Sequence, residues 1–119
     1  METGPKDIRV YVRADEKAPF SEWVESLRDR RAAVRVWSRV ARLRLGNLGD
    51  RCRVGGGVWE LRLHFGPGYR IYFGQAGMRV VLLLCGGDKS SQREDIDEAK
   101  SYWADYQEGV GRAADQELP

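Results

Sequence analysis

Residues 58–73, VWELRLHFGPGYRIYF, constrain the fold more than any other stretch of this chain. Hydrophobic and polar residues alternate on both sides of Gly66-Pro67-Gly68, and a period of two is that of a β-strand. Glycine and proline favour a tight reversal of the backbone. The stretch therefore predicts a β-hairpin that turns at these three residues and places Phe65 opposite Tyr69.

The register of this predicted hairpin gathers its polar side chains on one face. His64 then lies opposite Arg70. Arg62 lies opposite Tyr72, with Glu60 at the far edge of the cluster. Like charges on neighbouring strands repel each other unless an anion binds between them. This face therefore predicts a site for RNA or DNA phosphate, whereas the apolar face belongs to a core.

The remaining segments predict strands and helices around the hairpin. Residues 8–14 alternate in polarity and predict a first strand, and the apolar run at 79–85 predicts a central strand. Residues 20–45 contain no glycine or proline and would form a helix of roughly 39 Å, so we expect a break at 29–31 and two packed helices. The capping-box spacing at 91–94 predicts a further helix.

The predicted order is β-α-α-β-β-β-α, an α+β fold with a two-helix hairpin packed on a small, mostly antiparallel sheet and a C-terminal helix. Residues 1–119 form one domain in this prediction, with a core at about 8–106 and a flexible tail at 107–119. Residues 51–57 are expected to form a basic, glycine-rich loop. That loop either binds phosphate or gives the strand a flexible entry.

Charge is distributed unevenly along the chain. Residues 1–87 contain 16 Lys/Arg and 9 Asp/Glu, whereas residues 88–119 contain 4 and 9. Sixteen of the twenty basic residues are arginine, whose planar guanidinium suits bidentate contacts to phosphate. An arginine-rich solvated surface explains the same composition. Only its coincidence with the polar face of the hairpin favours a nucleic-acid partner.

Several classes of protein are excluded by simple features of the sequence. No apolar run is long enough to cross a bilayer, and the first residues do not resemble a secretion signal, so we expect a cytoplasmic protein without a membrane partner. Cys52 and Cys85 form no metal-ligand pattern, and we expect neither a metal nor a cofactor. Cys85 ends an apolar strand and is expected to be a buried thiol without a disulfide bond.

The segments WELRLHFGPGYRIYF and VVLLLCGGDKSSQREDIDEAKSYW resemble the RelE/ParE toxin superfamily. They are most similar to its HigB-like branch of addiction module killer proteins and their phage relatives. The resemblance covers roughly residues 8–106. It implies a compact fold of two helices against an antiparallel sheet, and the toxin of a type II toxin–antitoxin module. RelE-type members cut mRNA on the ribosome, and a helix-turn-helix antitoxin usually neutralises them.

The resemblance also implies particular site residues. Arg62, Arg70 and Lys89 occupy the positions of basic residues in the RelE-type site. Glu60 stands where RelE has another lysine, and Asp95 stands where its helix carries a catalytic tyrosine. The proton-transfer roles known for RelE therefore do not carry over to this chain.

Metal-free cleavage of RNA by its 2′-hydroxyl needs a base, a proton donor and positive charge at the scissile phosphate. We expect Arg62 and Arg70 to bind that phosphate, and Lys89 to neutralise the leaving group or a flanking phosphate. His64 is a candidate base, or else a stacking or positioning residue. Tyr72 either stacks on a base, donates a proton or is an ordinary strand tyrosine.

Three further arginines complete the predicted site. Arg51, Arg53 and Arg79 are expected to bind RNA, although Arg79 also fits a solubilising charge at a strand edge. Two other functions remain open. A ParE-like toxin directed at DNA gyrase would not need the polar face of the hairpin, and a non-catalytic relative would bind RNA or the ribosome without cutting.

Overall fold

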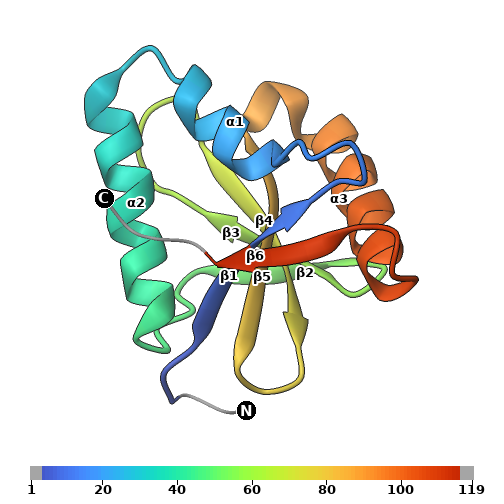
Figure 1. Ribbon diagram of the computed structural model, residues 1–119. Helices are drawn as coiled ribbons and strands as arrows, with labels where there is room; N and C mark the ends of the chain where they lie inside the picture. Colours follow the sequence, from blue (N-terminus) through green and yellow to red (C-terminus); the bar gives the residue numbers. More distant parts are fainter. Residues whose placement is uncertain (1–3, 116–119) are drawn as a thin grey trace.

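The computed structural model describes residues 4–115 (Figure 1). Within that range it contains three α-helices and one six-stranded, mostly antiparallel sheet, so the predicted α+β class is confirmed. In chain order the elements are β1 (Asp7–Val12), α1 (Pro19–Ser26), α2 (Arg30–Arg44), β2 (Arg51–Gly55), β3 (Val58–Arg62), β4 (Arg70–Ala76), β5 (Val80–Gly87), a 3₁₀ turn (Lys89–Ser91), α3 (Gln92–Gln107) and β6 (Arg112–Asp115). None of the described helices is long and apolar enough to cross a membrane.

The strands lie in the order β2-β3-β4-β5-β1-β6. Neighbouring strands are antiparallel, except that β1 and β5 run parallel. β5 lies inside the sheet, as its apolar sequence predicts, and the side chains of residues 81–85 are buried.

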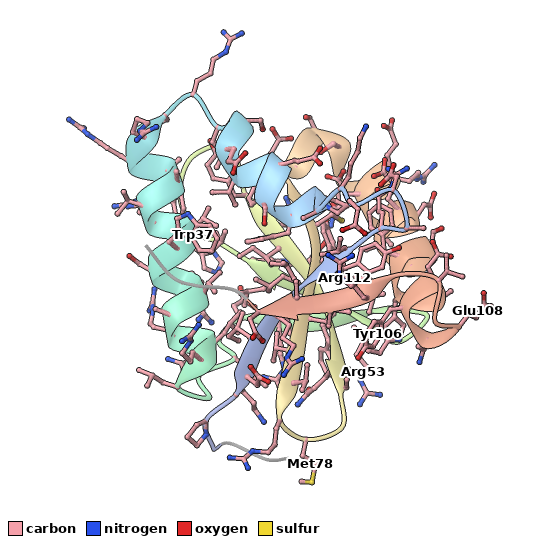
Figure 2. The ribbon with its side chains drawn as sticks, in the orientation of Figure 1. Trp37, Arg53, Met78, Tyr106, Glu108 and Arg112 are labelled. Carbon is pink, nitrogen blue, oxygen red and sulfur yellow. The ribbon has the colours of Figure 1, made fainter. Side chains whose placement is uncertain are left out.

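Helices cover both faces of the sheet. Figure 1 shows α1 and α2 on one side of the strands and α3 on the other. Phe20 and Val36 pack with the strands in one hydrophobic core, and Trp37 points from α2 towards the sheet (Figure 2). Ala99 and Trp103 of α3 pack in a second core with Tyr11 and other strand residues. The polar face of the hairpin therefore lies on the side that α3 covers.

The predicted break between the first two helices and the predicted start of α3 are both confirmed. Asp29 separates α1 from α2 and accepts a hydrogen bond from Arg31 N at 2.9 Å. Gly46 follows α2 with a φ of 92°, a conformation that glycine adopts without strain. α3 begins at Gln92 as expected, but Ser91 makes no side-chain bond to the backbone of that helix.

Two strands were not predicted. Residues 51–55, expected as a loop, form β2 because they pair with β3, with Arg51 opposite Leu61 and Arg53 opposite Trp59. The expected flexible tail at 107–119 is wrong for residues 112–115, which form β6 on the open edge of β1. Residues 116–119 of that tail lie outside the described residues.

The predicted hairpin exists, but its register differs by two residues. Glu60 pairs with Tyr72 and Arg62 pairs with Arg70. The connection spans residues 63–69 rather than three residues, and Leu63 N donates to Tyr69 O at 3.0 Å where the connection begins. A shift of two residues preserves the face on which each side chain lies.

Candidate active site

Glu60 lies at the centre of the polar face. Arg62, Arg70 and Tyr72 share this face, as predicted, because β3 and β4 keep their alternation. The expectation that Glu60 marks the edge of the cluster is wrong. Its carboxylate is fully buried beneath the first turn of α3 and lies between the two arginines.

The carboxylate of Glu60 accepts several hydrogen bonds. Oε1 accepts from Arg62 Nε at 3.1 Å and, more weakly, from Cys52 Sγ at 3.7 Å. Oε2 accepts from Tyr72 Oη at 3.1 Å and from Gln92 Nε2 at 2.8 Å. Burial alone would raise the pKa of Glu60, but these hydrogen bonds and the charge of Arg70 outweigh burial and lower that pKa. Glu60 is therefore ionised at neutral pH.

The two arginines are held in place by this carboxylate. Arg70 Nε lies 3.6 Å from Glu60 Oε2, and its Nη1 donates to Gly68 O at 2.8 Å. The Arg70 side chain is 12% exposed and that of Arg62 is 49% exposed. The Nε of Arg70 is buried and makes no hydrogen bond within residues 4–115, and both side chains lie on the same side of the sheet.

Lys89 lies next to Arg70. A Cβ added to Gly68 would be 3.4 Å from Arg70 Nη1 and 3.5 Å from Lys89 Cβ. Lys89 itself is exposed, and its backbone N–H donates to Pro67 O at 3.4 Å. Three of the predicted site residues, Arg62, Arg70 and Lys89, are thus brought to one end of the sheet.

Tyr72 does not lie where a base could stack on it. Its side chain is completely buried, and its hydroxyl donates to Glu60. Burial and the adjacent carboxylate raise the pKa of Tyr72 strongly. The structure corrects the stacking expectation, and Tyr72 instead holds Glu60 in position.

His64 does not face Arg70. It follows the end of β3, is 74% exposed and lies with Nε2 2.6 Å from Asp50 Oδ2. The two-residue change in register carries His64 out of the paired strands. The predicted pairing of His64 with Arg70 is therefore wrong, and the imidazole lines a cleft beside α2 that Arg62 also lines.

The three other predicted arginines lie away from the Glu60 cluster. The guanidinium carbons of Arg51 and Arg53 are 5.0 and 4.9 Å from the centre of the Trp59 ring, on the opposite face of the sheet. Arg79 lies in the β4–β5 turn, at the end of these two strands farthest from Arg70. These positions do not support one continuous RNA site with Arg62 and Arg70.

Two residues of α3 that the site prediction omitted contribute to this face. Gln92, which lies within the predicted capping box, donates from its side-chain amide to Glu60. Asp95 accepts a hydrogen bond from Ser91 Oγ at 2.5 Å. Burial raises the pKa of Asp95, and neighbouring carboxylates add to this effect although the bond from Ser91 opposes it. The only sequence signal that Gln92 belongs to the site was its position at the start of a helix that follows a buried strand.

Comparison with known proteins identifies one informative relative. No protein-family model matches the chain, and no solved structure gives a significant match. A protein of Haemophilus influenzae (strain Rd), described as uncharacterized, is 44% identical over 81 residues, which are 68% of this chain and 82% of the relative. The chain therefore belongs to the same family as this H. influenzae protein.

Proposed function

We propose that the protein is the toxin of a type II toxin–antitoxin module and acts as a ribosome-dependent mRNA endoribonuclease with a RelE-like topology. One observation carries the proposal. A buried carboxylate, Glu60, fixes Arg62 and Arg70 side by side on one face of the sheet, where Lys89 joins them.

The proposed chemistry is attack of the RNA 2′-hydroxyl on the neighbouring phosphate, with departure of the 5′-oxygen. Negative charge grows on the phosphate during this step, and fixed donors stabilise it most effectively. Glu60 engages Arg62 through Nε, and in the described part of the chain the terminal nitrogens of Arg62 make no hydrogen bond or ion pair. Arg62 and Arg70 bind the phosphate in this proposal, and Lys89 neutralises the leaving group.

Proton transfer falls to groups other than Glu60. Glu60 is buried and already accepts hydrogen bonds from Arg62, Tyr72 and Gln92, so it acts as a positioning residue. Asp95 lies on the same side of the sheet and has a raised pKa, which suits a proton donor. His64, oriented by Asp50, remains the candidate base if the RNA passes Arg62 towards the α2 cleft.

A helix-turn-helix antitoxin is the proposed cellular partner. Its acidic or helical segment would cover the arginine face and thereby block the approach of RNA. The net positive charge of residues 1–87 supports an acidic binding partner, because opposite charges across an interface attract.

The test is toe-printing on a translated message with the wild type and Arg70→Ala. Cuts in codon register are expected for the wild type, and the variant should lose about 100-fold in cutting rate because a fixed donor to the phosphate is gone. Arg28→Ala is the matched control, since Arg28 is exposed in the α1–α2 connection. Equal cutting by Arg70→Ala would remove Arg70 from the mechanism.

Two companion measurements, of DNA integrity and of ribosome binding, separate the rival functions. Double-strand DNA breaks with intact mRNA would identify a gyrase-directed toxin instead. Ribosome binding without cuts would identify a non-catalytic relative. Either result contradicts the nuclease proposal.

A further inference from the structure

A second cationic feature lies beside the Glu60 cluster. Between α2 and the end of β3 is a cleft of about 570 Å³. Its walls include four arginines and the histidine, namely Arg35, Arg39, Arg42, Arg62 and His64. Asp50 is the one carboxylate among its lining residues. Its Oδ2 already lies 2.6 Å from His64 Nε2.

Arg39 is the buried member of this set. The residue is only 7% exposed. Its guanidinium lies against Gly49, where any added Cβ would collide with Nη2. Nη1 donates to Asn47 O at 3.2 Å, and among residues 4–115 Arg39 makes no ion pair.

This arrangement is unfavourable for the fold alone. A buried guanidinium without a counter-ion costs free energy. Arg35, Arg39 and Arg42 are spaced by four and three residues, so their like charges also repel along one helix face. Burial and the charge of Arg42 both lower the pKa of Arg39. An anion bound in the cleft would relieve each of these costs.

The position of the cleft indicates which anion it receives. Arg62 lines the cleft and also binds Glu60, so the cleft borders the candidate active site at this residue. A guanidinium suits a phosphate because it donates two parallel hydrogen bonds. An RNA strand held at Arg62 and Arg70 would carry its next phosphates past this opening.

We propose that the cleft binds a backbone phosphate of single-stranded RNA next to the scissile phosphate, with Arg39 as its buried anchor and Arg42 and Arg62 as flanking cations. The identity of the RNA rests on the proposed function. The presence of a phosphate site in the cleft does not depend on that function, because it follows from the geometry of Arg39.

The probe is a fluorescent single-stranded RNA oligonucleotide with 2′-O-methyl groups, which prevent cleavage by the 2′-oxygen. Its affinity is measured by anisotropy over a series of salt concentrations. Ser38→Glu places a carboxylate in the cleft, and Ser38→Gln is the matched neutral control. We expect Ser38→Glu to weaken binding about tenfold, as loss of a charge-assisted contact does, and to reduce the salt slope by about 0.7.

Thermal unfolding of the same variants excludes a folding defect as the cause. Ser38 is exposed, and the new carboxylate lies four residues before Arg42, so the melting temperature of Ser38→Glu should not fall. Arg39→Met is expected to lose binding without losing thermal stability, because an apolar side chain of similar length replaces an unpaired buried cation.

Defined results would overturn the proposal. Wild-type affinity and salt slope for both Ser38→Glu and Arg39→Met would show that the RNA bypasses the cleft. Stabilisation by inorganic phosphate through Arg39, with no binding of the oligonucleotide, would assign the site to a free anion. Tight binding of a poly-glutamate peptide in place of the oligonucleotide would assign it to a protein partner.

The cleft and the nuclease proposal fail separately. If the wild type cuts no mRNA but binds the oligonucleotide through Arg39, the phosphate site stands and the nuclease assignment falls. If the wild type cuts mRNA and neither cleft variant changes oligonucleotide binding, the nuclease assignment stands and the phosphate site falls.

Discussion

Replacing Glu60 with glutamine tests the interaction on which the candidate site depends. The substitution keeps the size of the side chain and removes its charge. Arg62, Tyr72 and Gln92 donate to the carboxylate, and Arg70 Nε lies 3.6 Å away. An amide offers one acceptor oxygen to these donors and brings its own N–H group among them.

The expected loss of stability follows from these contacts. A hydrogen bond to a charged group contributes about 1 kcal/mol more than a neutral one, so three such bonds lose about 3 kcal/mol together. Arg70 is also left without its counter-ion, whereas half-exposed Arg62 recovers hydration. The total of about 3 kcal/mol is at the lower end of the range for breaking a buried ion pair. It corresponds to a fall in melting temperature of about 12 °C for a domain of this size.

The dependence of this loss on pH gives a second measurement. Folding lowers the pKa of Glu60, so its ionisation contributes stability above its unfolded pKa of about 4.3. That contribution disappears as pH falls through the lower folded pKa. The melting temperatures of the wild type and Glu60→Gln should therefore converge in acid.

Thermal unfolding followed by circular dichroism from neutral to acid pH checks both expectations. Glu25→Gln, at an exposed position on α1, is the control and should melt like the wild type. A fall of less than about 4 °C for Glu60→Gln at neutral pH would refute the reasoning, since it would mean that the interaction is worth less than 1 kcal/mol. A difference that persists unchanged in acid would refute the role of charge.

Three further predictions concern other parts of the molecule. Gly74→Ala should lower the free energy of unfolding by about 1–3 kcal/mol in urea denaturation, because the new methyl group would collide with the Trp103 ring. Iodoacetamide should modify Cys52 before Cys85 in the native protein, measured by peptide mass spectrometry, because burial raises the pKa of the Cys85 thiol and hides it. Asp95→Asn should slow mRNA cutting at least about 100-fold in the toe-printing assay without changing affinity for the uncleavable oligonucleotide, as expected for a proton donor.

Each of these predictions has a control or a contradicting result. Wild-type stability of Gly74→Ala would show that the sheet and α3 have room to separate at Trp103. Equal labelling of the two cysteines is expected only after unfolding in urea. Asp97→Asn, an exposed neighbour on α3, should cut like the wild type, and equal cutting by Asp95→Asn would exclude proton donation by Asp95.

Local patterns were sufficient to predict the central strand, the two-helix hairpin and the polar face of β3 and β4. Alternation of period two survives a shift of register by two residues, which is why Arg62 and Arg70 were placed correctly on one face. The register itself depends on the connection. Tyr69 packs against both Phe65 and Trp23 of α1 there, and no local pattern in the sequence reports that contact.

Long-range contacts account for the rest of what the sequence did not predict. β6, with the sequence RAAD, has no alternation of its own and is a strand because β1 offers it an edge. Gln92 reaches Glu60 across 32 residues of chain. Arg39 is buried because the segment that contains Asn47 and Gly49 packs over its guanidinium.

The position of β1 in the sheet has a consequence for how the chain folds. β1 pairs with β5 on one side and with β6 on the other, so both partners of the first strand come from the last 40 residues of the chain. Joining such distant segments requires closure of large loops, whereas β2 to β5 form from neighbouring segments. We therefore expect the β2–β5 meander to assemble early and β1 to be inserted after the rate-limiting step, so that a destabilising change in β1 accelerates unfolding more than it slows folding.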